Sequence, residues 1–175
     1  MIKFQRVLSL LLCILTTSIV AQRDLPKDYL KADFHKERRE LLRKSLPENS
    51  VAVFFANAVR NRANDVDYVY HQDPNFYYLT GYNEPNSVLL IFSEEQNTEG
   101  ESFNELIYVQ KRDPAKEQWN GIRLGVEGVS ENLGFKNVFD GEQFKDIQVD
   151  FSTFSRILFQ EFRNDVRDSD RDEAD

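Results

Sequence analysis

Cysteine is almost absent from this chain of 175 residues, in which Cys13 is the only one. A single cysteine cannot form a disulfide within the chain, and this excludes a small fold held together by disulfides. Histidine is nearly as scarce, since only His35 and His71 are present. Two histidines leave little material for a histidine-rich metal site or for catalysis by a histidine triad.

Positive charge is also in deficit, with 22 Lys and Arg against 30 Asp and Glu and a net charge of −8. This excess of acid argues against non-specific binding to DNA, RNA or anionic lipid, so no nucleic-acid partner is expected. The chain is 41% hydrophobic and 30% charged, which excludes a polytopic membrane protein, a collagen-like repeat and a wholly disordered chain. The length fits a single domain that buries its own core.

Familiar catalytic motifs are missing. The sequence has no HExxH zinc motif, no GxSxG nucleophile elbow, no Walker-type phosphate loop and no GxGxxG dinucleotide fingerprint. The glycines of GIRLGVEG do not have the spacing of a phosphate loop. The sequence motifs therefore indicate no catalytic chemistry.

The first 21 residues have the layout of a secretory signal peptide. A positive head with Lys3 and Arg6 precedes an apolar run at 7–15, and small and β-branched residues follow up to Ala21. The apolar run is shorter than the ~20 residues of a membrane-spanning helix, which favours a cleaved signal over the alternative of a membrane anchor. We therefore expect an exported protein, periplasmic or secreted, without a membrane contact after cleavage.

The rest of the chain alternates helical and strand patterns. Helices are predicted from an N-cap at Asp33 to Leu46, over 74–79, 114–120 and 126–133, and from an N-cap at Asp140 through Phe151. Strands are predicted at 50–56, 87–92, 105–110, 138–139 and 156–162, with a loop at 57–64, an extended segment at 65–71 and a polar, hairpin-like surface connection at 93–104. This order indicates one α/β domain with a mixed sheet of about five or six strands flanked by helices.

The first predicted helix has its apolar residues on one side. Phe34, Leu41 and Leu42 recur at helical spacing and are expected to face the core. The remaining sides are expected to carry the charged residues Lys36, Glu37, Arg39, Glu40 and Arg43.

Asp65, Asp67 and His71 are the best candidates for metal ligands. In an extended segment their even spacing would place the three side chains on one face. Two carboxylates and an imidazole suit manganese or zinc. The alternative interpretation is a polar loop in which His71 makes an ordinary hydrogen bond.

Aromatic residues gather between positions 68 and 82, and the only tryptophan, Trp119, lies on a short predicted helix. The cluster consists of Tyr68, Tyr70, Phe76, Tyr77, Tyr78 and Tyr82. These aromatics either pack the core and rim of the domain or form a recognition surface for a peptide or sugar. For Trp119, core packing and an interface or ligand contact both stay open.

Two long segments resemble the amino-terminal domain of aminopeptidase P, the Xaa-Pro aminopeptidase family. They are RNRANDVDYVYHQDPNFYYLTGYNEPNSVLLIF at 60–92 and ELIYVQKRDPAKEQWNGIRLG at 105–125. The motifs are Gln-Asp before Phe-x-Tyr-x-Thr-Gly, then Asn-Glu-Pro, then Glu-x-Trp-x-Gly-x-Arg-Leu-Gly. The resemblance implies a creatinase- or aminopeptidase P-like amino-terminal domain at 22–162, between the signal peptide at 1–21 and an acidic tail or linker start at 163–175.

This resemblance implies an activity for the whole enzyme, which removes an amino-terminal residue that precedes proline. A second, larger domain of pita-bread fold holds two manganese ions in that family through two Asp, one His and two Glu, and a metal-bridging hydroxide attacks the scissile carbonyl. The amino-terminal domain holds no metal ligand. It shapes the entrance of the active site and builds a homo-oligomer.

By the same resemblance, Trp119 matches a tryptophan that projects to the active-site edge of another subunit, and Asp65 matches an aspartate that pairs with an arginine near the catalytic site. His71 departs from the pattern, because an arginine is common there.

No segment supplies the metal ligands of the catalytic domain, so we expect no cofactor in this chain and no activity by itself. The chain would then be a truncated product, a gene fragment or half of a split enzyme. The alternative is a stand-alone module that binds a peptide or protein or mediates assembly.

Overall fold

The structure, a computed structural model, describes residues 30–98 and 101–160. The predicted signal peptide at 1–21 and the predicted tail at 163–175 lie outside the described residues.

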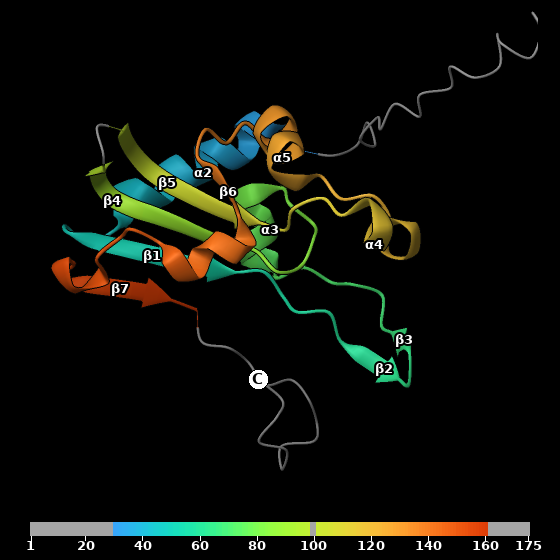
Figure 1. Ribbon diagram of the computed structural model, residues 1–175. Helices are drawn as coiled ribbons and strands as arrows, with labels where there is room; N and C mark the ends of the chain where they lie inside the picture. Colours follow the sequence, from blue (N-terminus) through green and yellow to red (C-terminus); the bar gives the residue numbers. More distant parts are fainter. Residues whose placement is uncertain (1–29, 99–100, 161–175) are drawn as a thin grey trace, which may run out of the picture.

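The domain is built on a five-stranded sheet with the order β6-β5-β4-β1-β7 (Figure 1). The strands are β1 (Ser50–Phe55), β4 (Val88–Thr98), β5 (Glu101–Val109), β6 (Val138–Asp140) and β7 (Arg156–Phe159). The central strand β4 is antiparallel to β1 and β5, whereas the edge strands run parallel to their neighbours, which confirms the predicted mixed sheet.

Three helices cover one face of this sheet (Figure 1). They are α2 (Ala32–Ser45), α3 (Pro74–Thr80) and α5 (Gly125–Leu133). The apolar core between the helices and the sheet contains Phe76, Leu79, Tyr82, Leu89, Ile91, Ile107, Val109, Val129, Leu133 and Phe135. Among the helices that the structure describes, none combines the length and the hydrophobicity needed to cross a membrane.

The other face is covered by residues 141–154, where the predicted helix from Asp140 through Phe151 is wrong. Asp140 does cap a turn, since its Oδ1 accepts from the backbone N of Glu142 at 3.0 Å. Two short 3₁₀ helices form instead, η1 (Gly141–Asp146) and η2 (Phe151–Thr153). This path lets five apolar side chains reach the second core, namely Phe144, Ile147, Val149, Phe151 and Phe154.

Local sequence signals set the bounds of α3. The Asp73 carboxylate accepts from the backbone N of Asn75 and Phe76 at 2.9 and 2.8 Å, as a helix cap does. Gly81 ends the helix with a φ of 71°, and a Cβ there would lie 2.8 Å from the His35 ring. Glycine is therefore required both for the turn and for the space.

The predicted cap of α2 is wrong, and the predicted hairpin-like connection is shorter than expected because the two strands extend into it. Helix α2 begins at Ala32 after Lys31, which makes no side-chain cap bond, so Asp33 lies in the first turn. Residues 93–104 were expected to be a connection, but most of them continue β4 and β5, with Gln96 paired to Phe103. Such polar residues suit an exposed hairpin and carry no hydrophobic signal for a strand.

The face of α2 that packs on the sheet also differs from the expectation. Arg39 and Arg43 are buried, whereas Leu41 is 54% exposed. The reason is Glu105 on β5, whose carboxylate oxygens accept from Arg39 Nε at 2.9 Å and Nη2 at 3.1 Å. Arg43 Nη2 donates to the same carboxylate at 3.1 Å. The largely shielded carboxylate of Glu105, whose side chain is 14% exposed, thus draws two arginines inward, where apolar periodicity predicts leucine.

Replacing Glu105 by alanine is expected to lower the free energy of unfolding by about 3–5 kcal/mol, because the Arg39 guanidinium would stay buried without its anion. Urea unfolding followed by circular dichroism measures this change. Glu95→Ala, at an exposed position of β4, is the matched control and should change stability by less than about 0.5 kcal/mol. Equal losses in the two variants would contradict the assignment.

Candidate functional site

Four of the five sheet strands end on the same side of the molecule. Because β1 and β5 are both antiparallel to β4, they point the same way, and β6 and β7 run parallel to them. Their carboxyl ends therefore meet where β4 begins. In open α/β sheets, ligands bind outside the carboxyl ends of strands. This end carries the candidate site.

An arm leaves the sheet after β1 and spans residues 57–71. At its tip, β2 (Asn61–Ala63) and β3 (Val66–Asp67) form an antiparallel hairpin apart from the main sheet (Figure 1). The predicted loop at 57–64 thus contains a strand, and Asp65 lies exposed in the turn. Exposed apolar side chains follow the arm, namely Val59, Val66, Tyr68 and Val69.

The arm does not assemble Asp65, Asp67 and His71 into a metal site. The Asp67 carboxylate accepts from Asn61 Nδ2 at 3.3 Å, and His71 lies at the foot of the arm. In residues 30–98 and 101–160 no group of three or more His, Cys, Asp or Glu could hold a metal ion. The described residues do not fit a manganese centre, and no chemical step through a metal is assigned to them.

Gln72 ties the foot of the arm to the turn before β4. Its Oε1 accepts from the backbone N of Asn57 at 3.0 Å, and its Nε2 donates to the carbonyls of Tyr82 at 3.2 Å and Glu84 at 2.9 Å. Tyr70 Oη adds a bond to the carbonyl of Asn57 at 3.0 Å. The arm is therefore exposed at its tip but firmly held at its foot.

Glu84 is a buried carboxylate in the Asn-Glu-Pro turn. It accepts from Tyr82 Oη and from the backbone N of Leu124, both at 2.9 Å. Burial raises the pKa of the fully buried Tyr82 above its usual value, and the adjacent Glu84 carboxylate raises it further. Because Leu124 is the last residue of the α4 loop (residues 113–124), its bond to Glu84 holds the end of that loop in place.

The α4 loop contains the helix α4 (Pro114–Asn120). As predicted, Asp113 caps the helix by accepting from the backbone N of Ala115 at 3.1 Å. The Glu117 carboxylate accepts from Arg112 Nε at 3.0 Å and Nη2 at 2.8 Å. Trp119 is 87% exposed on this loop, which excludes core packing, whereas its interface or ligand contact stays a prediction.

The other aromatics divide between the two interpretations. Phe76 and Tyr82 are fully buried in the core under the helices. Tyr68 and Tyr78 are exposed by 58% and 48%, and Tyr68 lies on the arm. The aromatic cluster is therefore part core and part surface.

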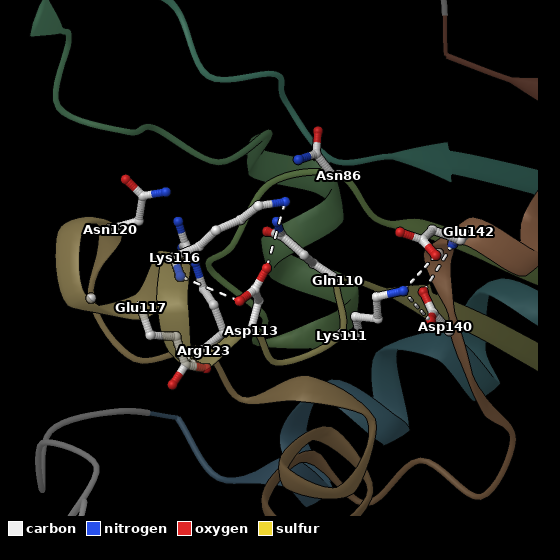
Figure 2. Close-up of a pocket in the computed structure, with 12 residues that line it drawn as sticks. Asn86, Gln110, Lys111, Asp113, Lys116, Glu117, Asn120, Arg123, Asp140 and Glu142 are labelled. Carbon is white, nitrogen blue, oxygen red and sulfur yellow. Dashed lines mark hydrogen bonds and ion pairs between the residues drawn. The ribbon is translucent and has the colours of Figure 1, made fainter.

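A pocket of about 290 Å³ lies beside the α4 loop, termed the α4 pocket (Figure 2). Its walls come from the turn before β4, from residues 110–123 after β5, and from residues 140–142 at the end of β6 and the start of η1. They are lined by Asn86, Gln110, Lys111, Asp113, Lys116, Glu117, Asn120, Gly121, Arg123, Asp140, Gly141 and Glu142. The sequence alone did not single out this pocket, because its residues come from three separate segments.

Sequence reasoning also missed Gln72 and Glu84 as organising residues. Both belong to the motifs of the resemblance, but a glutamate in a turn normally indicates a solvated side chain. The signal for Glu84 is the proline after it together with its partners Tyr82 and Leu124, and the partnership with Leu124 becomes visible only in three dimensions.

Comparison with known proteins gives a consistent result. The family model for "Aminopeptidase P, N-terminal domain" matches residues 35–155. An Xaa-Pro aminopeptidase of Haemophilus influenzae is 37% identical over 65% of this chain and 25% of its own length. The intermediate cleaving peptidase 55 of Schizosaccharomyces pombe is 36% identical over 63% of this chain and 22% of its own.

Solved structures agree with these relatives. Pseudomonas aeruginosa aminopeptidase PepP matches with a TM-score of 0.61 and 30% identity over 67% of this chain and 26% of its own. Escherichia coli aminopeptidase P with the inhibitor Pro-Leu matches with a TM-score of 0.64 and 25% identity over 74% of this chain and 29% of its own. The chain thus spans about a quarter of the length of these proteins.

Replacing Tyr82 by phenylalanine is expected to flatten the loss of stability at high pH. The folded chain keeps the phenol protonated above the usual pKa of about 10, so this contribution to stability is complete below pH 10 and is lost as the pH rises further. Urea unfolding between about pH 8 and 11 measures the slope. Val69→Ala, at an exposed side chain of the arm that does not titrate, is the control and should keep the wild-type slope. Identical slopes for all three proteins would contradict the prediction.

Proposed function

This chain belongs to the family of the aminopeptidase P amino-terminal domain, and from this premise we propose that it is the non-catalytic domain of an exported Xaa-Pro aminopeptidase. The domain shapes the active-site entrance and contributes to a homo-oligomer. A pita-bread domain outside this chain binds two manganese ions and releases the amino-terminal residue that precedes proline. The names of the relatives and the fraction of their length that this chain spans support the proposal.

The observation that carries the proposal is the exposure of Trp119 on a loop held at both ends. A cap at Asp113 fixes the start of the α4 loop, and Glu84 fixes Leu124 at its end. An indole 87% exposed on such a support loses little conformational freedom when a partner covers it. This suits an anchor that projects to the active-site edge of another subunit.

Asp65 supports the same role from the tip of the arm. Its side chain makes no hydrogen bond or ion pair with the residues that the structure describes, and it lies exposed in the hairpin turn. A carboxylate placed there is free to pair with an arginine near the catalytic site of the complete enzyme. Trp119 and Asp65 are thus positioning residues rather than catalytic ones.

Export is proposed from residues 1–21 alone, on their positive head, apolar run and small residues near Ala21. A chain without this segment contains no cysteine. Its stability outside the cell would therefore rest on its packed core rather than on a disulfide.

The same exposed surface favours a second function, a stand-alone module that binds a peptide or protein through Trp119 and the arm. The coding DNA downstream of residue 175 distinguishes the two. A continuing frame that encodes a pita-bread domain supports the first function. A stop followed by unrelated sequence supports the second.

The purified chain is expected to show no manganese-dependent hydrolysis of an Xaa-Pro peptide, because its described residues offer no metal ligand set. Release of the amino-terminal residue from Ala-Pro-Ala, with and without added Mn²⁺, measures this. Turnover that depends on the metal and survives repeated purification would refute the claim of inactivity.

Trp119→Ala is expected to lower kcat/KM about tenfold, equivalent to about 1.4 kcal/mol, in a chimera that joins this chain to the catalytic domain of the Haemophilus influenzae relative. The physical reason is the loss of the indole from the active-site edge. Gln118→Ala, at the exposed neighbour on the same helix, is the control and should leave kcat/KM unchanged. Equal activities of the two variants, or a folded chimera without activity, would contradict the proposed role.

A further inference from the structure

The two walls of the α4 pocket carry opposite unbalanced charges. Figure 2 shows Arg123, Lys116 and Glu117 on one side of Gln110, and Lys111, Asp140 and Glu142 on the other. Each wall contains both signs, so the charge that remains depends on how the ion pairs are formed.

On the first wall, the surplus is positive and belongs to Arg123. Both oxygens of the Glu117 carboxylate accept hydrogen bonds from Arg112. Asp113 forms an ion pair with Lys116, whose Nζ lies 3.7 Å from Asp113 Oδ2. Arg123 is half-buried and gives its backbone N–H to Glu117 at 3.2 Å. Its guanidinium has no hydrogen bond or ion pair with any residue in the described part of the chain.

On the second wall, the surplus is negative. Asp140 and Glu142 share a single cation, Lys111, whose Nζ lies 3.6 Å from Asp140 Oδ2 and also contacts Glu142 Oε2. One ammonium group neutralises only one of the two carboxylates. The wall therefore keeps about one negative charge for a ligand.

Between the walls lies an acceptor without a donor. Gln110 Oε1 is inaccessible to solvent and has no hydrogen-bond partner among the described residues. A buried carbonyl oxygen left without a donor costs about 1–3 kcal/mol, so rotation of the Gln110 amide toward an N–H of a ligand in the pocket is favoured.

We propose that the α4 pocket binds a zwitterionic α-amino acid or short unblocked peptide. The ligand carboxylate pairs with the Arg123 guanidinium, whose planar fork matches two carboxylate oxygens. The ligand ammonium lies toward Asp140 and Glu142, and an N–H donates to Gln110 Oε1. The volume of about 290 Å³ restricts the ligand to one or two residues. This proposal rests on the pocket alone and is independent of the proposed peptidase role.

The experiment titrates alanine and Ala-Ala into the purified chain by calorimetry and follows Trp119 fluorescence. Trp119 is the only tryptophan and adjoins Asn120, which lines the pocket. Saturable binding of at least one of the two ligands is expected, and the tighter of them shows the length that fits. Acetylating the amino end or amidating the carboxyl end of that ligand should weaken binding about tenfold each.

Variants then test each wall. Arg123→Gln should weaken binding of the zwitterionic ligand about tenfold, while the amidated ligand should bind this variant and the wild type with equal affinity. Glu142→Gln, at a side chain that is 73% exposed, should weaken binding of the zwitterionic ligand but not binding of the acetylated ligand. Arg156→Gln, on exposed β7, is the matched control and should bind as the wild type does.

Circular dichroism checks that each variant is folded, and if Arg123→Gln does not fold, Glu142→Gln decides alone because its side chain is on the surface. The proposal is overturned if neither alanine nor Ala-Ala binds saturably to the wild type. It is equally overturned if blocked and unblocked ligands bind alike, or if the folded wall variants bind as Arg156→Gln does.

Discussion

The Arg39–Glu105 ion pair is the interaction on which the arrangement of the helical layer depends. Arg39 lies on α2, binds Glu105 on β5 through two nitrogens, and donates from Nη1 to the carbonyl of Leu79 on α3 at 2.9 Å. Its guanidinium also lies 3.8 Å from the centre of the Phe135 ring, between α5 and β6. One buried side chain therefore sets the positions of two helices and a strand and contacts the connection that follows the third helix. Because α3 leads directly into the Asn-Glu-Pro turn, the position of α3 also sets the position of the turn that carries Glu84 in the candidate site.

The candidate site combines a well-bonded base with exposed ends. At the base, the side chains of Gln72 and Glu84 form hydrogen bonds with the arm, the turn and the α4 loop. At the ends, Trp119 and Asp65 meet solvent. A folded domain normally buries much of an indole, whereas this rigid base keeps Trp119 exposed, as its proposed role as an anchor requires. The unmatched groups of the α4 pocket lie at the same end, where four strands terminate.

Sequence reasoning succeeded where the signal is local. The Asp-Pro pairs at 73 and 113 gave two helix starts, Gly81 and Gly134 gave two helix ends, and the apolar runs gave the central strands. It failed where a distant partner decides. The inward face of α2 depends on Glu105, which is 66 residues from Arg39 along the chain. The extension of β4 and β5 is polar, and the α4 pocket draws on three segments, so neither leaves a pattern within a short window.

The parallel pairing of β7 with β1 has a consequence for the order of folding. It joins Ser50 to Arg156, so this edge closes the longest loop of the sheet, whereas the β4–β5 hairpin joins near neighbours. Loop closure costs entropy before any contact compensates it, so the hairpin is expected to form early and β7 late. All four residues of β7 are exposed, and little burial opposes its detachment. Among the strands of the main sheet, β7 is thus also the first that is expected to exchange its amide hydrogens.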